Sequence, residues 1–168
     1  GSLAILGGCG PMGMGAIDYA IHRDIKPKTI VVTDISDDRI NRAKQILTVE
    51  EAKNNGVDLH YVNPNNYENP IEYIKGLNNE SGFDDVMVYV PIKALVEQAD
   101  LLLGKDGCMN FFAGPIDSKF SSEINMYNIH YQATKIIGST GGNTDDMLES
   151  LEMTSKGLIN PAVMLTHV

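Results

Sequence analysis

The sequence is short of cysteine and of long apolar runs, and each shortage excludes a class of protein. Its two cysteines, Cys9 and Cys108, are too few for a disulfide framework or a four-cysteine zinc site. Both lie beside apolar residues, so we expect buried free thiols and a cytoplasmic, reducing location. No apolar run approaches the ~20 residues that a membrane-spanning helix needs, which argues against a membrane protein.

Basic residues are also scarce. The chain has 13 Lys and Arg against 22 Asp and Glu, a net charge of −9, and nucleic-acid binding needs the opposite sign. The acidic residues are scattered, as on a solvated surface. A length of 168 residues with 43% hydrophobic residues is enough for one domain with a core, and we expect residues 1–168 to form a single domain.

A glycine cluster near the N-terminus is the most informative stretch. After a short apolar run come Gly8, Gly10 and Gly13, the spacing of the dinucleotide-binding turn between a first strand and a first helix. Gly8 would permit the tight turn, Gly10 the close approach of a pyrophosphate, and Gly13 the packing of the helix. Pro11 would fix the turn, and Met12 would offer its backbone N–H to a phosphate at the helix N-terminus.

An acidic residue stands where this turn requires one. Residues 29–33 are β-branched throughout and predict a buried strand, and Asp34 follows it, about 20 residues after Gly13. In dinucleotide-binding folds that carboxylate binds the adenosine ribose, and it would repel a 2′-phosphate, so we predict NAD rather than NADP. Asp34 could instead cap the next helix, although Ser36 and Asp37 are better placed for capping.

Arg39 is a further candidate cofactor contact. It could stack on the adenine or reach a phosphate, or it could pair with Asp37 or Asp38.

Strand and helix patterns alternate along the chain. This order predicts an α/β fold, a doubly wound six-stranded parallel sheet of the Rossmann type. We expect residues 63–70 to form a loop and residues 161–168 to be extended. The expected strands are 2–6, 29–33, 59–62, 86–90, 108–113 and 135–139, and the expected helices are 12–25, 38–53, 71–77, 92–103 and 144–156.

Ligands of such sheets lie beyond the carboxyl ends of the strands. If the first half of the chain holds the adenosine and the pyrophosphate, the second half should hold the nicotinamide. The expected contacts are Val90, Pro91, Phe112, Ala113 and Ser139.

Several stretches resemble one enzyme family. Leu6–Gly13 and Val32–Asp34 resemble the cofactor domain of medium-chain zinc-type alcohol or polyol dehydrogenases, whose turn commonly reads glycine, any residue, glycine, proline, apolar, glycine. Gly82–Val86 resembles the approach to the family's fourth strand, and Ile136–Ser139 resembles its sixth strand. Gly10–Gly13 together with Ala16–Ala20 is similar to the sorbose-1-phosphate reductase branch.

This resemblance implies the NAD-binding domain of an enzyme that transfers hydride between NAD(H) and a secondary alcohol or ketone, such as a polyol or sugar phosphate. In that family the zinc ligands and proton-relay residues lie mostly in a separate domain. His22, His60, His130 and His167 form no Cys–His or His–Glu constellation, so we assign no catalytic residue and no metal ligand. The chain would then be a fragment of a two-domain enzyme without its catalytic domain, inactive alone, with zinc only in the missing domain. A homodimer is expected by analogy.

Two alternatives remain. Tyr131 and Lys135, with Ser118 upstream, have the spacing of the catalytic residues of a complete short-chain dehydrogenase. Against this, residues 135–139 favour a strand, and Cys9 stands where that family has glycine. The other alternative is a non-catalytic NAD-sensing module, because the same fold serves many functions.

Overall fold

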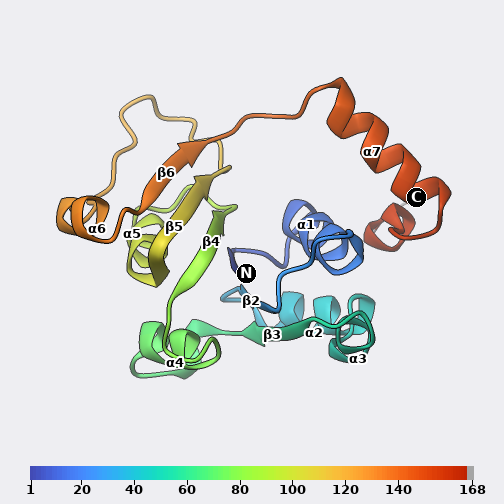
Figure 1. The fold of residues 1–168 in the computed structure, drawn as a ribbon, viewed down its shortest axis with the longest axis horizontal. Coiled ribbons are helices and arrows are strands. Elements are labelled where there is room, and N and C mark those ends of the chain that lie inside the picture. The colour runs from blue at the N-terminus through green and yellow to red at the C-terminus, as the bar shows by residue number, and fades with distance from the viewer. Residues whose placement is uncertain (166–168) are drawn as a thin grey trace.

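The computed structural model describes residues 1–165, and its centre is one six-stranded parallel sheet (Figure 1). The strand order β3-β2-β1-β4-β5-β6 confirms the predicted doubly wound α/β fold of the Rossmann type. The strands are β1 (Ser2–Leu6), β2 (Thr29–Thr33), β3 (Asp58–Val62), β4 (Phe83–Val88), β5 (Leu103–Phe111) and β6 (Lys135–Gly138).

Helices cover both faces of the sheet. The α-helices are α1 (Pro11–His22), α2 (Asp37–Ile46), α3 (Val49–Asn54), α4 (Pro70–Gly76), α5 (Lys93–Leu102), α6 (Met126–Tyr131) and α7 (Thr144–Ser155). Two 3₁₀-helices, η1 (Pro64–Asn66) and η2 (Pro161–Met164), complete the described elements.

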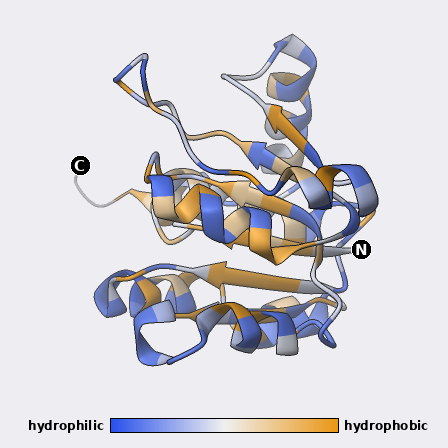
Figure 2. Cartoon of the chain, turned by 90° about the vertical axis from the view of Figure 1, so that its left-hand side faces the viewer, coloured by the Kyte–Doolittle hydropathy of each residue, from blue (hydrophilic) through white to orange (hydrophobic). Residues whose placement is uncertain are grey.

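Alternation along β1 divides the core into two clusters. Ile5 packs in the cluster that contains residues of α1, α2 and α3, whereas Ala4 and Leu6 pack in the cluster that contains residues of α4 and α5. Successive strand residues point to opposite faces, so a strand covered on both sides is apolar throughout. Figure 2 shows this pattern as orange strands between helices whose outer sides are blue.

The predicted helix over 38–53 is wrong as a single element. It is two helices, because α2 ends at Ile46 and the Thr48 hydroxyl accepts a hydrogen bond from the Glu51 N–H at 3.0 Å, which starts α3. A threonine side chain that satisfies a free backbone N–H favours a new helix start over continuation.

Other boundaries also differ from the sequence prediction. β4 ends at Val88 rather than Val90, and β5 begins at Leu103, before the predicted start at residue 108. The Asn143 side chain caps α7 by accepting from the Asp145 and Asp146 N–H groups, and α6 was not predicted. Pro161–Met164 is a 3₁₀-helix instead of extended chain, and residues 166–168 lie outside the described part.

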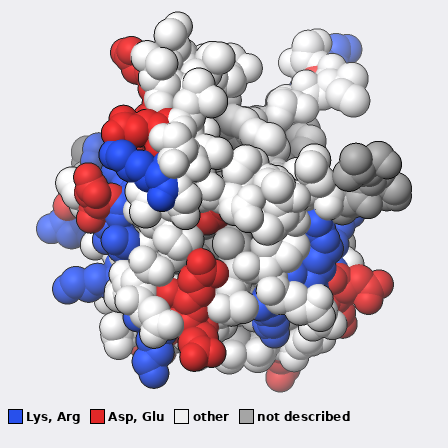
Figure 3. All heavy atoms as spheres, turned by 90° about the vertical axis from the view of Figure 1, so that its right-hand side faces the viewer, with Lys and Arg blue, Asp and Glu red and all other residues white. Residues whose placement is uncertain are grey.

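Charged residues of both signs share the face of the molecule in Figure 3. On the face in Figure 3, Lys and Arg are interspersed with Asp and Glu, and no basic patch forms there. Within residues 1–165, every helix is too short or too polar to cross a membrane.

Candidate functional site

The glycine turn lies between the end of β1 and the start of α1, at the carboxyl edge of the sheet. Gly7 takes a left-handed backbone conformation, with φ of +68°. The Gly8 N–H donates to the Thr33 carbonyl at 3.0 Å, which fixes the turn to the end of β2. The residue that needs a glycine backbone is therefore Gly7, and the prediction that Gly8 supplies it is wrong.

Gly8 and Gly13 are glycines for reasons of space. A Cβ on Gly8 would lie 2.7 Å from Ile5 Cγ2 and 2.7 Å from Val32 Cγ1, closer than carbon atoms can approach. A Cβ on Gly13 would overlap the backbone of Gly8, so α1 packs directly on the turn as predicted.

Gly10 differs from both, because no protein atom lies within 4 Å of the position a Cβ would take. It precedes the first residue of α1 and has no side chain to cap the helix. The first backbone N–H groups of a helix lack intrahelical partners, and the helix dipole is positive there. Pro11 has no N–H, and Met12 is 60% exposed, so the Met12 amide is among the groups available to an anion.

Asp34 follows β2 at the same edge of the sheet. Its side chain is buried, and its Oδ1 accepts a hydrogen bond from the Ser36 N–H at 3.0 Å. Ser36 caps α2, as the sequence predicted, by accepting from the Arg39 N–H at 3.4 Å. Arg39 Nη1 lies 3.9 Å from Asp34 Oδ1, so its ion pair is with Asp34 rather than with Asp37 or Asp38.

Cys9 lies inside the turn and is a buried free thiol, as predicted. Burial, and after it the negative charge of Asp34, raises its pKa to about 12. The thiol therefore stays neutral beside the N-terminus of α1 and does not oppose an anion there. Cys108 is only half-buried, which corrects the prediction of two buried thiols.

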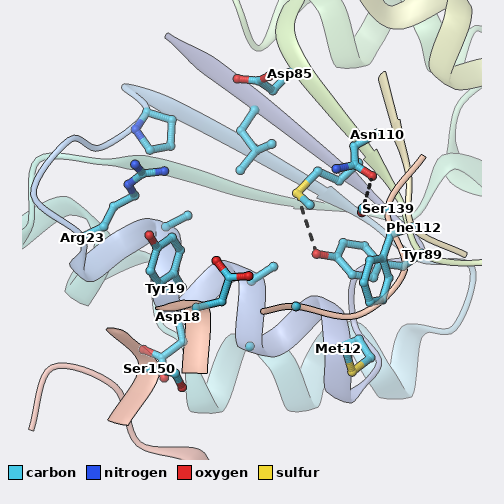
Figure 4. Close-up of a pocket in the computed structure, with 18 of the residues that line it drawn as sticks. Met12, Asp18, Tyr19, Arg23, Asp85, Tyr89, Asn110, Phe112, Ser139 and Ser150 are labelled. Carbon is cyan, nitrogen blue, oxygen red and sulfur yellow. Dashed lines mark hydrogen bonds between the residues drawn. The ribbon is translucent and has the colours of Figure 1, made fainter. Parts of the chain in front are cut away.

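A cavity of about 940 Å³ adjoins the turn on the side of β4, β5 and β6 (Figure 4). Pro11, Met12, Phe112 and Ser139, four of the predicted cofactor contacts, line it. The Ser139 hydroxyl donates to Asn110 Oδ1 at 3.0 Å, which joins the ends of β5 and β6.

The other predicted contacts lie outside this cavity. Val90 is half-buried, and it fills the space that a side chain on Gly7 would need. Pro91 is exposed, and Ala113 is buried with its N–H donating to the Val88 carbonyl at 3.0 Å. Asp34 and Arg39 form an ion pair and do not line the cavity. The predicted cofactor contacts therefore fall into two groups, one around Asp34 and one in the cavity.

Three polar or aromatic residues of this region were not singled out from the sequence. Asn110 and Tyr89 line the cavity, and Asn63 is buried at the end of β3. A signal existed for Asn110, because it is a polar residue inside an otherwise apolar strand. Asn63 likewise is the first polar residue after a strand, the position where ligand-binding side chains gather.

The residues of the short-chain alternative do not share an element. Tyr131 is the last residue of α6, and its ring contacts that of Tyr127 at a tilt of 42°, with ring centroids 4.4 Å apart. Lys135 is the first residue of β6, and its Nζ donates to the Asp106 carbonyl at 3.2 Å. That chemistry needs the lysine one helical turn from the tyrosine, so the structure contradicts this alternative. Within residues 1–165, no three His, Cys, Asp or Glu side chains are grouped to hold a metal ion.

The family model described as zinc-binding dehydrogenase matches residues 11–156. The chain belongs to the zinc-binding dehydrogenase family. The matched range begins at α1 and includes every later strand, so the resemblance predicted from the sequence is confirmed.

Named relatives are similar over the whole chain. It is 54% identical over 168 residues to mannitol-1-phosphate 5-dehydrogenase of Aliivibrio fischeri and 40% identical to L-sorbose 1-phosphate reductase of Klebsiella pneumoniae. It covers 100% of its own length and 40% of each relative, so it spans less than half of these dehydrogenases. The fold matches a protein described as a short chain alcohol dehydrogenase from Escherichia coli CFT073, complexed with NADH, with a TM-score of 0.75, 19% identity, and coverage of 99% of this chain and 44% of that one.

Proposed function

We propose that this chain is the NAD-binding domain of a dehydrogenase acting on a polyol or sugar phosphate. The observation that carries the proposal is the open face of Gly10 at the N-terminus of α1, on a turn that a hydrogen bond joins to the end of β2, where the Asp34 carboxylate follows. A pyrophosphate needs close approach to a helix N-terminus, and an adenosine ribose needs an acceptor carboxylate. The family match and the two sugar-phosphate relatives support the same assignment.

In this proposal each part of the site binds one part of the cofactor. Gly8, Gly10 and Gly13 shape the turn, and the Met12 and Gly13 amides donate to the pyrophosphate. Asp34 accepts from the ribose hydroxyls. The nicotinamide faces the cavity near Phe112 and Ser139, together with the backbone around Val90, Pro91 and Ala113. When bound, NAD accepts the hydride that leaves a secondary alcohol.

The carboxylate of Asp34 favours NAD over NADP, because a 2′-phosphate would be placed beside a buried negative charge. Arg39 does not offset this preference, since its guanidinium already faces Asp34 and is 64% exposed.

Calorimetric titration of the protein with NADH and NADPH tests this assignment. We expect NADH to bind more tightly, and Asp34→Ala to weaken NADH binding by about tenfold, the loss of a charge-assisted hydrogen bond. Equal NADH affinity in the two proteins would remove Asp34 from the site. Tighter binding of NADPH would instead point to Arg39 as the selecting residue.

We further propose that the substrate pocket, the proton relay and the zinc belong to the remaining length of an enzyme resembling the relatives in size. This chain alone would then bind NAD and oxidise no alcohol. The neutral buried Cys9 thiol favours a reducing, cytoplasmic location. The exposed side chains of Ile136 and Ile137 on β6 favour association of two copies, which sedimentation velocity would detect.

A non-catalytic NAD-sensing module would share this binding site. The match to dehydrogenases and the identity to two named enzymes favour the enzyme domain over the sensor.

A further inference from the structure

The loop between β2 and α2 carries Asp34, the acidic part of the site, yet residues outside the loop contribute much of what fixes its position. Asp34 is buried, but Ile35, the residue after it, is 66% exposed, and Asp37 is exposed too. A loop with so few buried side chains has little packing to fix it. Its position must therefore depend on hydrogen bonds.

Asn63 supplies two of these hydrogen bonds. It follows β3, the neighbour of β2, and its side chain is among the buried polar groups, with the residue only 9% exposed. Its Nδ2 donates to Asp37 Oδ1 at 2.7 Å and to the Ile35 carbonyl at 3.4 Å. Its Oδ1 accepts from the Asn65 N–H at 3.1 Å.

This arrangement fixes the orientation of the amide. Turning it over would direct Oδ1 at a carboxylate and a carbonyl, neither of which can donate, and Nδ2 at a backbone N–H. The short bond to Asp37 is charge-assisted, and such bonds are about twice as strong as neutral ones. Asn63 thus joins the end of β3 to both sides of the loop that begins at Asp34.

We infer that Asn63 is a positioning residue for the Asp34 carboxylate, and that it thereby sets the preference for NADH over NADPH. The inference rests on the proposed function. Asn63 does not touch the cofactor in this account, because its polar atoms are engaged by Ile35, Asp37 and Asn65. It acts by keeping the loop in the conformation in which Asp34 faces the ribose.

The test compares NADH and NADPH dissociation constants in wild type, Asn63→Ala and Asn66→Ala. Asn66 is the matched control, because it is an exposed asparagine in η1, the 3₁₀-helix that Asn63 caps. We expect Asn63→Ala to weaken NADH binding by about tenfold, to change NADPH binding little, and so to bring the ratio of the two constants toward one. Asn66→Ala should leave the ratio unchanged.

A merely structural role would weaken both cofactors in proportion and leave the ratio as in wild type, and that result would overturn the inference. If Asn63→Ala does not fold, substitutions of Asp37, the hydrogen-bond partner of Asn63, test the same inference. Asp37→Ala removes the same hydrogen bond and should bring the ratio of the NADPH and NADH dissociation constants closer to one. Asp37→Asn keeps an acceptor oxygen and should retain most of the wild-type preference for NADH. An unchanged ratio in Asp37→Ala also counts against the inference. Failure of wild type to bind NADH, by contrast, overturns the proposed function itself.

Discussion

Gly13 and Gly15 stand two residues apart in α1, and their surroundings predict opposite effects of the same substitution. A Cβ on Gly13 would overlap the backbone of Gly8, whereas a Cβ on Gly15 would meet nothing within 4 Å. We expect Gly13→Ala to lower the free energy of unfolding by about 1–3 kcal/mol and to abolish tight NADH binding, because α1 must move away from the turn. Gly15→Ala should raise it by up to about 1 kcal/mol, since alanine favours a helix interior.

Urea unfolding of both variants beside wild type measures these effects. Equal stability of Gly13→Ala and wild type would mean that α1 does not pack on the turn as described.

The two cysteines also differ in their surroundings, and the difference predicts which of them reacts. Cys9 is buried with a pKa raised to about 12, whereas Cys108 is half-buried and its pKa is raised mainly by desolvation. Only the thiolate reacts with disulfide reagents, so reaction needs both access and ionisation. At pH 8 we expect the native protein to expose no more than one slowly reacting thiol, Cys108, and the unfolded protein to expose two.

Titration with a chromogenic disulfide reagent, with Cys108→Ser as the control, checks this assignment. Rapid reaction of Cys9 in the native Cys108→Ser variant would show that the turn opens in solution.

At the scale of elements, sequence patterns predicted the helices and strands whose bounds depend on packing. They missed boundaries that depend on a single hydrogen bond. The run over 29–33 is β-branched throughout and almost wholly buried because β2 is covered on both faces, so its bounds were predicted correctly. The division between α2 and α3 depends on one hydroxyl, that of Thr48, in a stretch whose periodicity continues across the break. α6 was missed for a similar reason, because it has no buried residue to create an apolar pattern.

α7 is a long helix with little packing to hold it in place. Met153 is its one buried residue, while Met147, Leu148 and Leu151 are each more than half exposed. A hydrogen bond from the Tyr19 hydroxyl to Glu149 Oε1 at 2.8 Å joins it to α1. We expect the backbone amides of α7 to exchange with solvent deuterium much faster than those of α5, which has four buried residues.

Hydrogen exchange followed by mass spectrometry measures this difference, and Tyr19→Phe should accelerate α7 further while leaving α5 unchanged. Protection of α7 equal to that of α5 would mean that α7 packs against another surface in solution.

For the whole molecule, buried weak acids predict a loss of stability at alkaline pH. Burial raises the pKa of Tyr61 and Tyr89, and of Cys9 to about 12, from ordinary values of 10.0 for the phenols and 9.0 for the thiol. The folded protein holds these protons more tightly than the unfolded chain. Their contribution to stability is therefore complete below about pH 9 and is lost as pH rises toward the folded-state values.

Urea unfolding at a series of pH values from 7 to about 11 measures this decline. Tyr61→Phe should reduce its slope, even though it also removes the hydrogen bond from Tyr61 to the Leu47 carbonyl. Repeating the series at high salt separates the effect of these buried groups from general charge repulsion, which salt screens. Stability independent of pH over this range would contradict the burial of these groups.

The candidate site was predicted from the sequence in its backbone parts more than in its side chains. Glycine spacing and the position of Asp34 follow from the order of strand, turn, helix and strand, which the sequence displays locally. Asn63 and Asn110 belong to the site because neighbouring strands end beside each other, and strand order across the sheet is not local information. The second half of the site was therefore predicted as a list of strand ends, of which the cavity includes only some.

The contact between Gly7 and Val90 has a consequence for protein engineering. Val90 occupies the space that any side chain at residue 7 would take, although the two residues come from opposite halves of the sheet. A copy of the turn transplanted into another protein without Val90 would therefore lack the side chain that packs against Gly7. A grafted version must carry residue 90 along with residues 7–13. Residue 7 must also stay glycine, because its φ of +68° would strain any other residue even where residue 90 is made smaller.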